Sequence, residues 1–276
     1  MTHYLLCTDL DRTLIPNGVQ QSSPSSLAVF AEFVRREHIT LAYVSGRHLE
    51  LVEDAIHAWH LPQPRFAICD VGSSIYQHSE GEWHVSLNWQ QWIAASWENQ
   101  EASRIAMLLD KDCSLQLQEA EKQGNYKLSF YAEAGTDTQK LMARLQQRLE
   151  SQGMQSNLIW SIDTARNLGL LDILPARAGK LQAIRFLMQE QGFDLQHTLF
   201  AGDSGNDLDV MLSDIPSILV ANAEADIKHS VQAAHADTLY IAKGSWHGMN
   251  GNYSAGILEG IDHFWPEAGL HIPERA

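Results

Sequence analysis

The sequence predicts an α/β protein with a Rossmann-like parallel sheet core and an inserted α/β (α+β) domain. Near both ends of the chain, short continuous apolar runs alternate with amphipathic helical stretches, which is typical of strands buried on both faces by helices. From about residue 83 to residue 171, the strand-like segments alternate apolar and polar residues instead, which is typical of a sheet with one buried face. We therefore expect a core formed by residues 1–82 and 172–276, and an inserted domain formed by residues 83–171.

The first third of the chain predicts a repeated strand-helix-strand pattern. Strands are expected at Tyr4 to Thr8, Thr40 to Val44 and Phe66 to Cys69. Ser23-Pro24 predicts the start of the first helix, with Ser23 as the N-cap and Pro24 at the first helical position. In a parallel sheet, the residues that follow the carboxyl ends of the strands meet at one edge, so we expect a functional site there.

The pattern changes in the inserted region and then resumes. Alternation is clearest at Ser114 to Gln118 and at Lys127 to Tyr131, and Asp137 to Ser151 predicts the helix that covers this sheet. The core pattern resumes with a strand at Leu170 to Leu174, a helix at Lys180 to Gln191, and strands at His197 to Ala201 and Ser217 to Val220.

The charge of the chain argues against nucleic acids and anionic membranes as partners. There are 34 acidic and 19 basic residues, the formal net charge is −15, and no run of Lys and Arg occurs. A nucleic-acid binder needs a basic face that displaces counterions. No stretch approaches the ~20 apolar residues of a membrane span.

The cysteines and the amino-terminal residues indicate a cytoplasmic protein. Cys7, Cys69 and Cys113 are odd in number and lack the spacing of a zinc site, so we expect reduced thiols. The first residues carry no basic segment of a signal peptide. The sequence leaves the oligomeric state open, and a monomer is compatible with it.

The first candidate for chemistry is Asp9-Leu10-Asp11-Arg12-Thr13, which follows the first predicted strand. Strand side chains repeat every two residues, so Asp9 and Asp11 leave the strand on the same side and repel each other. A divalent cation would offset this repulsion, because Mg²⁺ prefers carboxylate and carbonyl oxygens. A solvated turn is the alternative, since Asp and Thr are common turn residues.

A second acidic segment, Gly202-Asp203-Ser204-Gly205-Asn206-Asp207, follows another predicted strand. In a parallel sheet, Asp203 and Asp207 can therefore converge with Asp9 and Asp11 around one ion. The alternative is a loop that caps the next helix through Asn206 or Asp207.

Two further segments are suited to binding phosphate. Ser45-Gly46 lies at a strand-to-helix junction, where a hydroxyl group and backbone N–H groups favour an anion. Lys180 opens a helix after Gly179 and can place an ammonium group at the same edge. Taken singly, Ser45 could be a helix cap and Lys180 a surface lysine.

This ordered set of segments resembles the four motifs of the haloacid-dehalogenase-like phosphatase superfamily, and it spans almost the whole chain. Further segments are similar to those of sucrose-6-phosphate phosphatases: Asp70 to Tyr76, Tyr126 to Tyr131, Leu171 to Pro175 and Ser254 to Glu259. The resemblance implies an α/β cap between the second and third motifs.

The resemblance also implies catalytic roles. Asp9 would be the nucleophile that forms an aspartyl-phosphate, and Asp11 would be the general acid and base, with a pKa raised by its acidic neighbours. Mg²⁺ would be held by Asp9, the backbone carbonyl of Asp11, Asp203 and, through water, Asp207. The phosphate-binding residues would be Ser45, Gly46, Lys180 and Asn206.

For the sugar, the resemblance points to Lys127 of the cap, with Arg47 and Asp172 at the seam between cap and core. Tyr126 and Tyr131 could stack on a sugar face, although aromatic residues at alternating strand positions are more often core residues. The glycine-rich stretch 244–253 is either part of the substrate rim or a surface loop, and we favour the loop.

The resulting expectation is a Mg²⁺-dependent phosphatase that hydrolyses a sugar phosphate, with sucrose 6-phosphate as the best single substrate. Mannosylfructose phosphate or an aminosugar 6-phosphate is the closest alternative. A phosphohexomutase would have to shield the aspartyl-phosphate from water. A non-catalytic phosphate sensor such as a receiver domain is far shorter and lacks a large insertion at this point.

Overall fold

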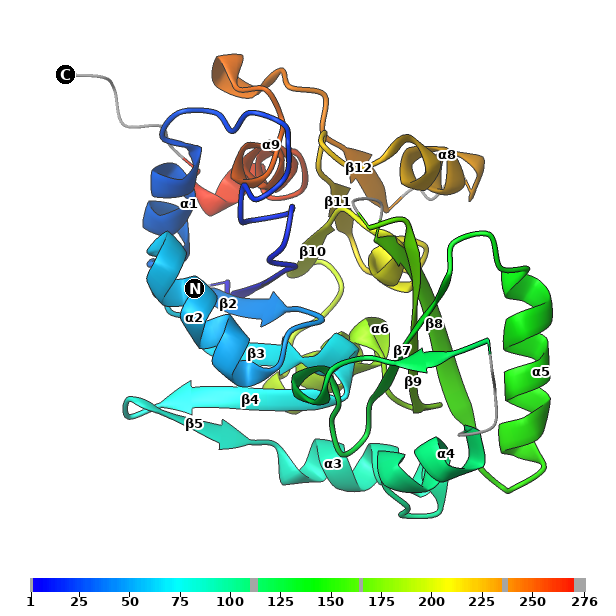
Figure 1. The fold of residues 1–276 in the computed structure, drawn as a ribbon. Coiled ribbons are helices and arrows are strands. Elements are labelled where there is room, and N and C mark those ends of the chain that lie inside the picture. The colour runs from blue at the N-terminus through cyan, green and yellow to red at the C-terminus, as the bar shows by residue number, and fades with distance from the viewer. Residues whose placement is uncertain (1, 110–113, 164–165, 235–237, 271–276) are drawn as a thin grey trace.

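The larger of two sheets forms the centre of the molecule. The computed structural model describes residues 2–109, 114–163, 166–234 and 238–270 (Figure 1). Within these residues the larger sheet has eight strands, in the order β12 (Leu239–Ile241), β11 (Ser217–Leu219), β10 (Thr198–Gly202), β1 (Tyr4–Thr8), β2 (Ile39–Val44), β3 (Phe66–Cys69), β4 (Ser74–Ser79) and β5 (Glu82–Val85). The strands from β12 to β3 pair in parallel, and β4 and β5 add an antiparallel edge. This confirms the predicted parallel core.

Helices cover both faces of the larger sheet (Figure 1). One face packs against α1 (Ser26–Val34), α2 (Leu49–Trp59) and α9 (Ser254–Phe264). The other packs against α3 (Leu87–Ala94), α6 (Lys180–Gln191), α7 (Leu208–Met211) and α8 (Ala225–Ala234). The central strands are fully buried because each contributes apolar side chains to both layers, as their continuous apolar runs predict.

The smaller sheet is antiparallel and is covered by helices on one face. Its order is β6 (Gln116–Leu117), β7 (Leu128–Glu133), β9 (Leu168–Pro175) and β8 (Ser156–Asp163), and the covering helices are α4 (Ala102–Leu109) and α5 (Thr138–Glu150). Leu141, Leu145 and Leu149 form the buried stripe of α5, as predicted. The opposite face of this sheet looks toward the carboxyl ends of the core strands rather than toward open water.

Short 3-10 helices connect several of these elements. They are η1 (Asp70–Gly72), η2 (Ala95–Trp97), η3 (Ala120–Lys122), η4 (Gly205–Asp207), η5 (Trp246–Gly248) and η6 (Pro266–Ala268).

The chain changes sheets slightly later than expected at both crossings. Residues 82–85 still pair in the larger sheet, although the insertion was expected from residue 83. The strand expected at Leu170 to Leu174 belongs to the smaller sheet rather than to the core, because β9 pairs with β7 and β8. The strand predicted at Ser114 to Gln118 is limited to the two residues of β6.

The start of the first helix also differs from the prediction. Helix α1 begins at Ser26, and its N-cap is Ser25. Ser23 cannot cap the helix because its hydroxyl group donates to Asn250 Oδ1 and accepts the backbone N–H of Asn250, both at 2.9 Å. A tertiary contact therefore displaces the local helix signal.

The glycine-rich stretch 244–253 is a loop away from the functional edge, since none of its residues lines the cavity described below. It packs against the segment before α1 and is held by the buried carboxylate of Glu259, which accepts the backbone N–H groups of Lys243 and Gly244 at 2.8 and 2.9 Å. The preference for a surface loop is thus confirmed.

Candidate active site

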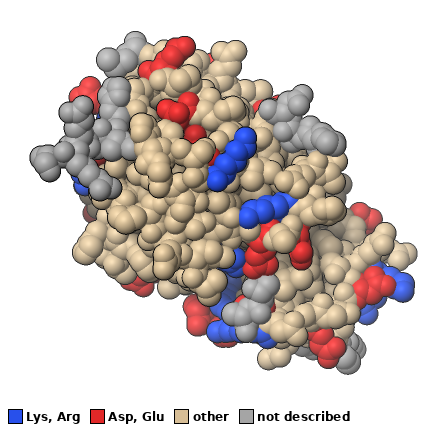
Figure 2. Space-filling model, turned by 90° about the horizontal axis from the view of Figure 1, so that it is seen from above, with Lys and Arg blue, Asp and Glu red and all other residues tan. Residues whose placement is uncertain are grey.

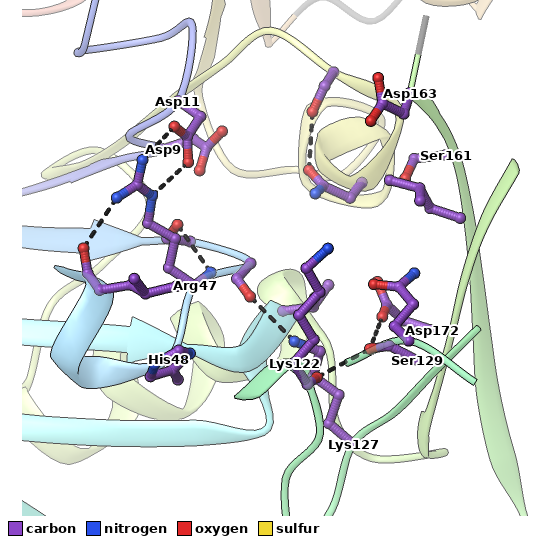
Figure 3. Close-up of a pocket in the computed structure, with 18 of the residues that line it drawn as sticks. Asp9, Asp11, Arg47, His48, Lys122, Lys127, Ser129, Ser161, Asp163 and Asp172 are labelled. Carbon is purple, nitrogen blue, oxygen red and sulfur yellow. Dashed lines mark hydrogen bonds and ion pairs between the residues drawn. The ribbon is translucent and has the colours of Figure 1, made fainter. Parts of the chain in front are cut away.

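A cavity of about 380 Å³ lies between the carboxyl edge of the larger sheet and the uncovered face of the smaller sheet (Figure 3). Residues that follow β1, β2 and β10 form its core side, and β7, β8, β9 and η3 supply its other wall. Of the residues predicted from the sequence, the following line the cavity: Asp9, Asp11, Ser45, Gly46, Arg47, Lys127, Asp172, Asp203 and Asn206.

Three buried carboxylates meet at the base of the cavity. Oxygen atoms of Asp9, Asp203 and Asp207 all lie within 4.8 Å of one another. Burial, together with the neighbouring charge of Asp207, raises the pKa of Asp203 to about 7. Burial likewise raises the pKa of Asp9 well above its usual value. The trio thus carries more negative charge than its surroundings offset.

Lys180 supplies one positive charge to this trio. Its ammonium nitrogen lies 2.7 Å from Asp207 Oδ1 and 3.3 Å from Asp9 Oδ1, and its side chain is fully buried. Lys180 is therefore not a surface lysine. Although burial opposes its charged form, the two carboxylates raise the pKa of Lys180 above its usual value.

The charges and donor atoms of the trio fit a divalent cation. Arg12 forms an ion pair with Asp203, with Arg12 Nε 3.5 Å from Asp203 Oδ2, although this buried nitrogen makes no hydrogen bond within the described residues. The donor atoms are carboxylate oxygens, the ligands that Mg²⁺ prefers. Asp207 Oδ2 already accepts the backbone N–H groups of Asp203 and Ser204 at 3.1 Å, which limits Asp207 to an outer position around an ion.

The environment of Asp11 differs from the expectation of a raised pKa, because Arg47 forms an ion pair with its carboxylate. Arg47 Nε and Nη2 donate to the two oxygens of Asp11, each at 2.7 Å (Figure 3). Asn17 Nδ2 also donates to Asp11 Oδ1, at 2.6 Å. Burial alone would raise the pKa of Asp11, but these hydrogen bonds and the charge of Arg47 lower it. The expectation of a raised pKa is therefore wrong for this conformation.

The Ser45-Gly46 segment lies at the edge of the cavity, where β2 ends. Ser45 is buried, and its hydroxyl oxygen accepts the backbone N–H of Arg47 at 3.2 Å. Asn206 lines the opposite side, where its side-chain oxygen accepts the Ser204 hydroxyl at 3.0 Å.

Lys127 bridges the two sheets. Its ammonium group donates to the carbonyl oxygen of Gly46 at 3.2 Å and lies 3.5 Å from Asp70 Oδ1, with both side chains at most 10% exposed. Asp172 accepts a hydrogen bond from the Ser129 hydroxyl. Lys127 and Asp172 thus lie on the cavity wall as predicted, but the ammonium group of Lys127 is engaged by the core.

Several residues of the wall were missed by the sequence analysis. They are Gln118, Lys122, Ser129, Ser161 and Asp163. Ser129 and Asp172 are cross-strand partners in β7 and β9, so the alternating pattern contained a signal for Ser129. Lys122 lies in a short 3-10 helix with no such pattern. Tyr131 also lines the cavity, whereas Tyr126 packs near Trp97 in the core of the smaller sheet.

The charge distribution on the surface and the state of the described cysteines match what the sequence indicates. On the face drawn in Figure 2, basic side chains are few and lie near acidic ones. Among the described residues, none of the helices has both the length and the apolar character needed to cross a bilayer. Cys7 and Cys69 are buried free thiols, and Cys113 lies outside the described residues.

The parallel sheet, the carboxylate trio with its lysine and the inserted sheet define the class of the haloacid-dehalogenase-like phosphatases. Residues 2–265 match the family model described as Sucrose-6F-phosphate phosphohydrolase, and the chain belongs to this family. It is accordingly a phosphoric monoester hydrolase.

Individual relatives support the same class. The chain is 49% identical over 267 residues to a putative HAD-like hydrolase of Nitrosococcus oceani. The match covers 95% of this chain and 72% of the relative. It is 26% identical to sucrose-phosphatase 1 of Nicotiana tabacum over 94% of this chain, but spans only 59% of that protein. The crystal structure of the sucrose-phosphatase from Synechocystis, in complex with sucrose and phosphate, matches with a TM-score of 0.79 at 25% identity and covers 96% of this chain and 98% of that one.

Proposed function

We propose that this protein is a Mg²⁺-dependent phosphatase that hydrolyses sucrose 6-phosphate to sucrose and phosphate. The observation that carries the proposal is the carboxylate trio with its buried lysine, placed at the base of a cavity whose opposite wall is polar. The base suits a phosphoryl group and the wall suits a hydroxylated leaving group. The smaller sheet and its helices serve as the cap that selects the sugar.

Asp9 acts as the nucleophile. One of its carboxylate oxygens attacks phosphorus, the bond from phosphorus to the sugar oxygen breaks, and an aspartyl-phosphate forms. The ammonium group of Lys180 beside Asp9 orients this carboxylate and offsets charge on the phosphoryl oxygens. The Ser45 hydroxyl, the Gly46 backbone N–H and the Asn206 amide hold the outer oxygens.

Asp11 transfers the protons. It protonates the departing sugar oxygen in the first step and takes a proton from the attacking water in the second, when the Asp9–phosphorus bond breaks. In the described conformation both of its oxygens accept from Arg47, so this ion pair must separate first. A bound phosphate would favour the separation, because it offers the guanidinium group another anion.

Asp9, Asp203 and the backbone carbonyl of Asp11 would hold the Mg²⁺ ion, with Asp207 outside them. When bound, the ion supplies electrostatic stabilisation of the charge on the transferring phosphoryl group. The excess of buried negative charge in the trio supports this assignment.

The test is release of phosphate from a panel of sugar phosphates. The panel contains sucrose 6-phosphate, mannosylfructose phosphate, glucose 6-phosphate, fructose 6-phosphate and an aminosugar 6-phosphate, and we expect the highest kcat/KM with sucrose 6-phosphate. A phosphohexomutase would return an isomeric sugar phosphate, and a sensor would release no phosphate catalytically.

Asp9→Asn tests the mechanism. We expect it to abolish phosphate release, because a neutral amide is a poor nucleophile. Asp226→Asn is the matched control, since Asp226 is exposed and does not line the cavity. Undiminished turnover in Asp9→Asn would refute the role of this residue. EDTA should stop turnover and Mg²⁺ should restore it.

A further inference from the structure

Arg12 lies beside the carboxylate trio in an unusual backbone conformation. Its φ is +59°, in the left-handed region that residues other than glycine rarely adopt. Two side chains hold it there: the backbone N–H of Arg12 donates to Asn17 Oδ1 at 2.8 Å, and its carbonyl oxygen accepts from Asn222 Nδ2 at 2.6 Å. A conformation that neighbouring groups maintain against its local cost points to a role for the side chain that it directs.

The side chain of Arg12 lines the cavity, and its guanidinium group lies between two carboxylates. Nη1 donates to Glu224 Oε1 at 3.0 Å, and Nε lies 3.5 Å from Asp203 Oδ2. Glu224 directly precedes α8 and is 39% exposed, whereas the side chain of Asp203 is only 3% exposed. The closer contact is therefore with the exposed acid, so Glu224 restrains the guanidinium group from approaching Asp203.

The contacts of Asp203 leave one of its oxygens available to a metal ion. The Thr13 hydroxyl donates to Asp203 Oδ1 at 2.9 Å, and Oδ2 is the oxygen that faces Arg12. Within the described residues, Oδ2 accepts no hydrogen bond and the buried Nε of Arg12 donates none. A buried donor without a partner is costly. Arg12 thus lies close enough to attract Asp203 but does not occupy its free oxygen.

The charge of Arg12 has two opposite effects at this place. A guanidinium group stays charged at any pH at which a protein functions. In the metal-free protein it offsets part of the negative charge of Asp203. When a divalent cation is bound by the trio, the same charge repels that cation. The carboxylate of Glu224 offsets part of this repulsion because it pairs with Arg12.

We propose that Arg12, restrained by Glu224, is a positioning residue that holds Asp203 in the metal-free protein and lowers the affinity of the site for Mg²⁺. The inference rests on the proposed function, because it takes the carboxylate trio as the Mg²⁺ site. A residue that ligates no metal thus sets the Mg²⁺ concentration at which the site fills.

The experiment measures Mg²⁺ binding by titration calorimetry, on protein that has been treated with EDTA and dialysed, without any sugar phosphate. Arg12→Met removes the charge, Arg12→Lys keeps it, and Arg12→Gly removes both the charge and the backbone cost, so that it serves if Arg12→Met does not fold. Arg185→Met is the matched control. Arg185 also pairs with an acid, Asp214, at 2.8 Å, but does not line the cavity.

We expect Arg12→Met and Arg12→Gly to lower the Kd for Mg²⁺ about 5-fold to 30-fold, on the scale of one charge pair near a protein surface. Arg12→Lys should keep most of the effect of the wild-type residue, and Arg185→Met should match the wild type. In EDTA, the Tm of Arg12→Met should fall below that of the wild type, because the trio loses an offsetting charge. An unchanged or higher Kd in Arg12→Met and Arg12→Gly would overturn the inference.

Glu224→Gln tests the restraint on Arg12. We expect it to raise the Kd for Mg²⁺ about 3-fold, because the guanidinium group can then approach Asp203 Oδ2 and compete with the ion. Combined with Arg12→Met, the same change should have a clearly smaller effect, since no guanidinium group remains to be released. Equal effects in the two backgrounds would overturn the role assigned to Glu224.

Failure of the proposed function gives a different result, because Mg²⁺ binding is measured apart from hydrolysis. If the wild type hydrolyses no sugar phosphate but Arg12→Met binds Mg²⁺ more tightly than the wild type, the proposed function fails and the role of Arg12 is supported. If neither the wild type nor the Arg12 variants bind Mg²⁺, the role of Arg12 is refuted, whatever the phosphatase activity.

Discussion

Replacing Lys180 by methionine should destabilise the metal-free protein strongly. The change removes the ammonium group that lies 2.7 Å from Asp207 and 3.3 Å from Asp9, in a place where none of the lysine side chain is exposed. Breaking a buried ion pair by removing one partner costs about 3–5 kcal/mol, since the remaining charge stays buried. For a chain of this size, that corresponds to a fall in Tm of roughly 6–20 °C.

The measurement is thermal unfolding followed by circular dichroism in EDTA and in Mg²⁺. Arg185→Met is the control, because Arg185 lies on the same helix and pairs with Asp214 at 2.8 Å, but both side chains are more than half exposed. Its effect should stay below about 1 kcal/mol. Added Mg²⁺ should reduce the difference in Tm between Lys180→Met and the wild type, because the ion replaces part of the lost positive charge.

The reasoning would be refuted if Lys180→Met in EDTA unfolded within about 1 kcal/mol of the wild type. That result would mean that the lysine does not offset the carboxylates in the folded protein. The effect of Lys180→Met on activity can be measured apart from its effect on stability, at a temperature at which both the variant and the wild type are folded.

Other expected outcomes concern the scaffold. Leu145→Ala should lower the free energy of unfolding by about 3–5 kcal/mol in chemical denaturation, because Leu145 is fully buried beneath the smaller sheet. Gly72→Ala should prevent recovery of folded protein on expression, since the added carbon would lie 2.3 Å from the backbone of Gly179 at a φ of +95°. At Gly81, the φ is +84° but no atom lies within 4 Å of the added carbon. Gly81→Ala should therefore lower the free energy of unfolding in chemical denaturation by only about 1 kcal/mol. Glu259→Gln should lower the free energy of unfolding in chemical denaturation by about 1–3 kcal/mol. The Glu259 carboxylate accepts hydrogen bonds from the Tyr240 hydroxyl and from the backbone N–H groups of Lys243 and Gly244, and a neutral amide oxygen is a weaker acceptor.

The buried elements of the core could be predicted because their signals are local. Tyr4–Thr8 and Phe66–Cys69 match the predicted strands residue for residue, and Lys180–Gln191 matches the predicted helix. Continuous apolar runs and a Gly before a helix act within a few residues. Ser23 failed as a helix signal because its partner Asn250 is 227 residues away along the chain.

The site could be predicted as a set of residues but not as a set of contacts. The trio of Asp9, Asp203 and Asp207 follows from the rule that parallel strands end at one edge. The engagement of Asp11 by Arg47 depends on side-chain conformations across 36 residues, which no local pattern specifies. Its consequence for the pKa of Asp11 could therefore not be foreseen.

The position of β1 between β2 and β10 has a consequence for synthesis on the ribosome. The nucleophile segment is made before its partners, because its strand pairs on one side with residues 198–201 and the carbonyl oxygen of Arg12 accepts a hydrogen bond from the side-chain amide of Asn222. A nascent chain that ends before residue 198 has Asp9 but lacks the adjoining strand, Asp203 and Asp207. The hydrolytic centre can thus assemble only after Asn222 has been translated, so a nascent chain that ends before this residue would not consume sugar phosphates.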